Sequence, residues 1–190
     1  MLLESGLGNG KLAGIDGDNR LLTASFNIPF NHVIAKDYAK VFSATATTTT
    51  AAGTETVLVL KNNNQDRPIV PVSLYVQSIT ATALPAVTDY ISAELGGDYT
   101  SGGVQVTPVN TTSGSSTISN AAIYYDNPTV SAGGEAWRIH PSTQPFSYEF
   151  DGGLVIPPSQ TLIIKYTGAA AADVVANISF AVVGTDDYSG

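Results

Sequence analysis

The chain lacks cysteine, has only eight Lys plus Arg residues, and contains no long apolar run. Without cysteine it can form no disulfide and no thiolate-bound metal site. Its sixteen Asp plus Glu residues give a formal net charge of −8. Because phosphate binding needs clustered Lys and Arg, this balance argues against nucleic acid and anionic membranes as partners. No apolar stretch is long enough to span a bilayer.

Charged residues are also scarce, at 13% of the chain, against roughly 25% in an average soluble domain. Twenty-one Thr and 17 Ser residues supply much of the polar surface instead. Thr is β-branched and suits a pleated strand. The 190 residues are enough for one well-cored domain. Residues Met1–Gly6 show no basic and no apolar region typical of a secretory signal, so we expect the protein to fold in the cytoplasm where it is made.

Hydrophobic periodicity predicts strands throughout. Apolar residues alternate with polar ones over 69–79 and 174–183, and the run Val57–Leu60 is typical of a buried strand. Gly, Pro and Asn separate these stretches, and no segment gives a convincing helix. The pattern predicts an all-β protein, an antiparallel β-sandwich or jelly roll. The expected strands cover residues 22–29, 41–47, 56–61, 69–79, 90–95, 118–125, 137–139, 146–150, 161–166 and 174–183, with loops at 47–53 and 96–117 and a short strand left open at 104–109.

Residues 1–21 differ from the rest of the chain, because five glycines punctuate isolated apolar residues. Glycine at this density raises the entropy cost of ordering the backbone. Two interpretations remain open: a disordered terminus, or an arm that orders only against a neighbouring subunit. We therefore divide the chain into an extended N-terminal arm, 1–21, and a β-sandwich domain, 22–190.

Catalytic and metal-binding chemistry is poorly represented. The only histidines are His32 and His140, no Gly-x-Ser-x-Gly nucleophile motif occurs, and two histidines without cysteine make a zinc site a poor expectation. We expect a non-enzymatic protein with no catalytic residue, no metal and no cofactor. A carbohydrate-active enzyme on the same fold would need two carboxylates to meet across a cleft. The candidates for such a pair are Glu94, Asp98, Glu135, Glu149 and Asp151.

Several short patterns carry a resemblance to a known group of proteins. They are Ser5–Lys11, Asp18–Leu21, Val59–Asn63, Thr107–Asn110 and Gly153–Leu162. Together they resemble structural proteins of tailed-bacteriophage virions, which include capsid decoration and cement proteins. The resemblance implies a β-sandwich or jelly-roll body, a homotrimer, and attachment to the major capsid protein on the outer capsid of the virion. It brings no catalytic residues to this chain.

Two sets of residues follow as candidates for binding. The first set is a hypothetical interface with the capsid or a neighbouring subunit, and it consists of Leu2, Leu3, Leu7, Leu12, Ile15, Arg20, Phe26 and Phe30. The second belongs to an alternative function, a tail or fibre receptor-binding module that grips host glycan with exposed aromatic rings. Its members are Tyr99, Tyr124, Tyr125 and Trp137. A fibre or pilus subunit is a third alternative, which the missing secretory signal disfavours.

Overall fold

The computed structural model describes residues 3–4, 12–15, 21–22, 40–79, 89–140, 146–150 and 153–183, the first three stretches by their backbone only. All named elements in these stretches are β-strands, and every strand pair is antiparallel. The predicted all-β, antiparallel class is confirmed. Three short strands, β1 (Leu3–Glu4), β2 (Leu12–Ile15) and β3 (Leu21–Leu22), form a small sheet in the order β1-β2-β3.

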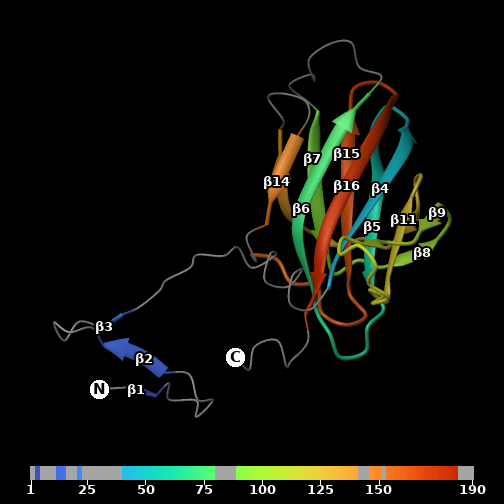
Figure 1. Ribbon diagram of the computed structural model, residues 1–190. Helices are drawn as coiled ribbons and strands as arrows, with labels where there is room; N and C mark the ends of the chain where they lie inside the picture. Colours follow the sequence, from blue (N-terminus) through green and yellow to red (C-terminus); the bar gives the residue numbers. More distant parts are fainter. Residues whose placement is uncertain are drawn as a thin grey trace.

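Two larger sheets form the body of the protein (Figure 1). The five-stranded sheet has the order β10 (Val109–Asn110), β4 (Val41–Thr50), β16 (Ala172–Val182), β6 (Ile69–Ser78) and β14 (Phe146–Glu149). The six-stranded sheet has the order β13 (Gly134–Ile139), β7 (Tyr90–Leu95), β15 (Thr161–Gly168), β5 (Gly53–Asn62), β11 (Ala121–Tyr125) and β9 (Val104–Val106). A separate ribbon pairs β12 (Thr129–Val130) with β8 (Tyr99–Ser101).

Period-2 alternation creates the core between the two sheets. In β16 the residues from Ala172 to Val182 with even numbers are buried, and those with odd numbers are partly exposed up to Ser179. The inward side chains of both sheets form one hydrophobic cluster. Phe42 and Phe180, opposite each other on β4 and β16, stack with ring centroids 5.8 Å apart. Burial of this shared face is what holds the sheets together.

Strand β4 is longer than the sequence predicts. The expected loop at 47–53 was wrong, because β4 continues to Thr50. Thr48 and Thr50 point into the sandwich, where their hydroxyls donate to the carbonyls of Val57 and Ala172 at 3.1 and 3.0 Å. A threonine can occupy an inward position because its hydroxyl finds such a partner. In the loop-rich stretch 96–117, the short strand left open at 104–109 is present as β9 and the start of β10, whereas β8 was not expected.

The long connection from β7 to β13, residues 96–133, begins and ends at the same place, because its last residue lies against its first residues. A Cβ on Gly133 would lie 2.7 Å from the Leu95 carbonyl oxygen and 2.9 Å from the Gly97 nitrogen. Between these ends the segment supplies β9 and β11 to one sheet and β10 to the other. Figure 1 shows β8, β9 and β11 together at the side of the sandwich away from β14. The excursion therefore extends both sheets at the same edge.

The Phe42–Phe180 stack gives a direct test of the core. Phe180 is fully buried, and a Phe→Ala change in a core typically costs about 3–5 kcal/mol. We expect Phe180→Ala to lower the free energy of unfolding by that amount in chemical denaturation. Thr107→Ala, at an exposed position, should change it by less than about 0.5 kcal/mol. Equal effects of the two changes would contradict the described core.

Candidate interaction surfaces

Most of the first candidate set, the hypothetical capsid or subunit interface, lies outside the described residues. This applies to Leu2, Leu7, Arg20, Phe26 and Phe30. Leu3, Leu12 and Ile15 belong to the small sheet, where Leu3 pairs with Ala13, Glu4 with Leu12, and Ile15 with Leu21. Only their backbone is described. The N-terminal arm therefore stays a prediction.

Two of the four candidate aromatics come together. The rings of Tyr99 and Tyr124 stack in parallel, with centroids 3.7 Å apart and an interplanar angle of 5°. The Tyr99 hydroxyl donates to the Gly102 carbonyl at 3.0 Å. Tyr125 follows Tyr124 on β11, so it points to the opposite face of that strand. The stack therefore fixes one side of the ribbon formed by β8 and β12 to the sheet.

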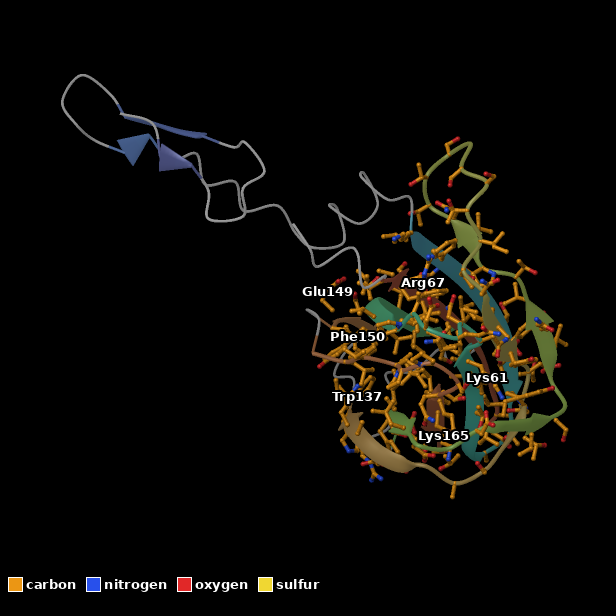
Figure 2. The ribbon with its side chains drawn as sticks, turned by 90° about the horizontal axis from the view of Figure 1, so that it is seen from below. Lys61, Arg67, Trp137, Glu149, Phe150 and Lys165 are labelled. Atoms are coloured by element: carbon orange, nitrogen blue, oxygen red, sulfur yellow. The ribbon has the colours of Figure 1, made fainter. Side chains whose placement is uncertain are left out.

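Trp137 lies at the other edge of the sheet, on β13. Four strand spacings of about 4.8 Å separate β13 from β11, or roughly 19 Å. Its ring packs 5.0 Å from Tyr148 and 6.3 Å from Phe150, against the core, and its Nε1 is buried without a hydrogen-bond partner among the described residues. Figure 2 shows Trp137 and Phe150 on the same side of the sandwich. This cluster closes the edge between β13 and β14, so the four aromatics do not form one stacking platform.

The start of the 96–133 segment crosses the outer face of the six-stranded sheet. Val59 and Ile163 point to that face, yet both are fully buried. A Cβ on Gly97 would lie 2.8 Å from Ile163 Cδ1 and 2.6 Å from the Ser131 carbonyl oxygen. Only a residue without a side chain allows this approach. The central strands are therefore covered on both faces.

Asp98 anchors the crossing segment to the sheet. Its carboxylate accepts hydrogen bonds from Lys61 Nζ at 2.9 Å, from the Thr161 hydroxyl at 3.1 Å and from the Tyr99 amide at 2.8 Å. Its backbone nitrogen donates to the Ser131 hydroxyl at 2.8 Å. The hydrogen bond from Lys61 is the main cause that lowers the pKa of the Asp98 carboxyl, and desolvation opposes it. This ion pair is the main polar link between the crossing segment and β5.

The carboxylates considered for an enzyme are spread over both sheets. Glu94 and Glu135 lie opposite each other on β7 and β13, but each already has a basic partner. Lys165 Nζ lies 2.7 Å from Glu94, and Arg138 lies 2.6 Å from Glu135. Glu149 is on β14 in the other sheet, and Asp151 lies outside the described residues. None of the four described acids lines the asparagine-rich cavity beside the β5–β6 loop or the cavity beside Pro157 and Pro158.

The outer face of the five-stranded sheet is different in character. Strand register places three cross-strand rows side by side on β4, β16 and β6. We call this grid the hydroxyl face, and it consists of Ser43, Ser179, Ser73, Thr45, Asn177, Tyr75, Thr47, Val175 and Gln77. Asn177 Nδ2 donates to the Thr45 hydroxyl at 2.6 Å, and the Tyr75 hydroxyl donates to Gln77 at 2.7 Å. The grid holds no charged residue, and Asp173 and Glu149 lie only at its margins.

Two cavities lie near the end of the sandwich where β5 leads into β6. One encloses about 400 Å³ and is lined by Asn63, Asn64, Gln65, Asp66, Arg67 and Asn120. The other has a volume of about 380 Å³ and has Leu95, Val155, Pro157 and Pro158 among its lining residues.

His140, the one described histidine, has its Nδ1 3.2 Å from the Asp89 carbonyl oxygen and its ring 5.5 Å from Tyr90.

The close approach at Gly97 can be tested by one added methyl group. Gly97→Ala places a Cβ within 3 Å of two groups, one of them a backbone carbonyl. Such overpacking typically costs about 1–3 kcal/mol. We expect this loss in the free energy of unfolding, together with faster amide exchange in β8. Gly134→Ala is the control, because the nearest atom to its Cβ would be the Leu95 oxygen at 3.9 Å.

The Asp98 ion pair predicts a dependence on pH. A carboxyl whose pKa is lowered in the folded state adds stability above its unfolded pKa of about 3.9, and that stability is lost as pH falls through the folded value. We therefore expect Asp98→Asn to flatten the fall in the free energy of unfolding between about pH 4 and pH 2. The Asp98 side chain is 53% exposed, so the change should be small. Asp126→Asn removes an equal charge from an exposed turn and is the charge-matched control.

Among the described residues, no group of three or more His, Asp or Glu side chains is placed to hold a metal ion. The same stretches contain no helix long and apolar enough to cross a membrane. Comparisons with protein-family models, with curated proteins and with solved structures found no match for this chain.

Proposed function

We propose that this protein is a structural component of a tailed-phage virion, of the capsid decoration or cement type, which attaches to the assembled shell and stabilises it. The hydroxyl face is the observation that carries the proposal. Protein interfaces are depleted of charge at their centre and polar at their rim. A charge-free grid with Asp173 and Glu149 at its margins has that distribution of charge, in a chain of net charge −8.

The connectivity of the sandwich supports this assignment. Without the strands of the 96–133 excursion, the sheets have the orders β4-β16-β6-β14 and β5-β15-β7-β13. We interpret these eight strands as a jelly roll, in which two Greek keys wrap around one core. Viral capsid proteins and lectins are among the proteins that use this architecture. The interpretation favours a role in binding extended surfaces.

Attachment through this face has a simple thermodynamic consequence. A subunit that binds the assembled shell and not its free parts stabilises the shell by mass action. A homotrimer would present three hydroxyl faces at once, and avidity would then raise occupancy without any new kind of contact. The partner in this proposal is the major capsid protein. The part of the 96–133 excursion that covers the opposite sheet, from which β10 is excluded, would then face solvent.

The arm belongs to the same proposal. Residues 1–21 and Phe26–Phe30 would add contacts to neighbouring subunits beside the hydroxyl face. An arm that orders on binding can wrap a large surface, at the cost of ordering entropy. Deletion of residues 2–20 should lower occupancy without unfolding the sandwich.

A single charge on the hydroxyl face tests the proposal. Thr47 is exposed in the row that it forms with Val175 and Gln77, and burial of an unpaired carboxylate there costs several kcal/mol. We expect Thr47→Glu to reduce the ratio of this protein to the major capsid protein at least tenfold, measured by mass spectrometry of purified virions. Thr107→Glu adds the same charge on the excursion and should bind normally. Equal occupancy of both variants, or virions that lack the protein, would refute the proposal.

A further inference from the structure

The cavity lined by asparagines has only polar side chains in its lining. Its six lining residues carry four amides, one carboxylate and one guanidinium, and they line a depression of about 400 Å³ that is open to solvent. That volume is at the lower end of the range for small-molecule sites. The cavity lies beside the loop from β5 to β6, at the lower end of the sandwich in Figure 1, and Figure 2 looks onto that end and labels Arg67. We call it the amide pocket.

A fully buried asparagine holds the pocket in one shape. Asn62 is 0% exposed. Its Nδ2 donates to the carbonyl oxygens of Arg67 and Ile156, both at 2.9 Å, and its Oδ1 accepts from the amide nitrogen of Asn64 at 3.0 Å. The backbone amide of Asn63 donates to the backbone carbonyl of Asn120 at 3.1 Å, and this bond joins the two sides of the pocket. Because these bonds fix the backbone of the pocket, ligand binding needs to order only the exposed side chains.

The side-chain amides of the pocket have hydrogen-bond donors and acceptors available to a ligand. Asn64 Nδ2 donates to Asn62 Oδ1 at 2.8 Å and to the Ser119 carbonyl at 3.0 Å. These bonds use both of its protons, so its Oδ1 is the acceptor left for a ligand. Within the part of the chain that the structure describes, the side chains of Asn63, Gln65 and Asn120 make no hydrogen bond and are exposed. Each amide can donate two hydrogen bonds and accept two.

The chemistry of this lining selects one class of ligand. Asp66 and Arg67 cancel in charge, so an anion such as phosphate gains no net attraction. One carboxylate is too few for a calcium site, and the lining offers no aromatic or aliphatic side chain to an apolar ligand. A neutral polyhydroxylated molecule fits best, because its hydroxyls both donate and accept, as the amides do. We infer that the amide pocket binds a neutral saccharide of one or two rings.

This site is independent of capsid attachment and does not use the candidate aromatics Tyr99, Tyr124, Tyr125 and Trp137. It lies at the loop from β5 to β6, whereas the hydroxyl face lies on the outer side of β4, β16 and β6. A virion protein could therefore hold both sites at once. If the test of one site fails, the proposal for the other site is unaffected.

The test is saturation-transfer NMR on the full chain. The probes are glucose, galactose, mannose, N-acetylglucosamine, lactose and maltose, with glucuronate, glucose 6-phosphate and triglycine as comparators. We expect transfer to at least one neutral sugar and none to the charged sugars or the peptide. No transfer to any neutral sugar overturns the inference, and so does a preference for glucose 6-phosphate or triglycine.

Two variants assign binding to the pocket. Asn120 has a positive φ of 47°, a conformation that glycine adopts freely, so Asn120→Gly removes the side chain and keeps the backbone. Gln65→Ala removes a second amide from an exposed position. Each should weaken the sugar's affinity at least tenfold. Gln105→Ala, an exposed amide on β9, should leave it unchanged, and unchanged affinity in both pocket variants would overturn the assignment.

Discussion

The structure depends on two central strands that must be kept from water on both faces. Val57–Leu60 of β5 and Leu162–Ile164 of β15 are all 0% exposed. The five-stranded sheet covers their inner side, as in any sandwich. Antiparallel sheets commonly leave the other face to solvent, and here the 96–133 excursion covers it instead. The glycine at position 97 and the anchoring of Asp98 follow from this requirement, because the covering segment must lie directly on Ile163.

The six-stranded sheet is covered on its outer face and the five-stranded sheet is not, and the charged residues are distributed differently over the two sheets. Three of the five described basic residues, Lys61, Arg138 and Lys165, pair with acids of the six-stranded sheet or its crossing segment. The five-stranded sheet instead presents hydroxyls and amides that bond one another, both between strands and along β6. Such a surface is hydrated without charge, and its desolvation costs less than that of ions. This asymmetry makes one face of the sandwich better suited to contact than the other.

The sequence predicted the elements whose signal is local. The apolar run Val57–Leu60 and the alternation over 69–79 and 174–183 correspond to β5, β6 and β16. The end of β4 was missed because a run of threonines has no apolar member, although Thr48 and Thr50 are buried through their hydrogen bonds. Long-range proximity was also out of reach. No local pattern says that Tyr99 stacks on Tyr124 while Trp137 packs at the far edge, since that depends on strand order.

The turn at residues 62–66 depends on the hydrogen bonds of one buried polar residue, Asn62. The sequence 62–66 reads as a polar turn, yet Asn62 lies in the interior and Asn64 is nearly buried. An apolar residue of similar size at position 62 would remove the hydrogen bonds that Asn62 makes to the Arg67 carbonyl and the Asn64 backbone amide, while the Ile156 carbonyl would keep its hydrogen bond from the Ile69 amide. Each buried group left unsatisfied costs about 1–3 kcal/mol. The amide is therefore required by the loops it joins, not by the core. Because its hydrogen bonds are made to backbone groups of the adjoining loops, Asn62 fixes the backbone that carries the neighbouring amides, and the same residue closes this end of the sandwich.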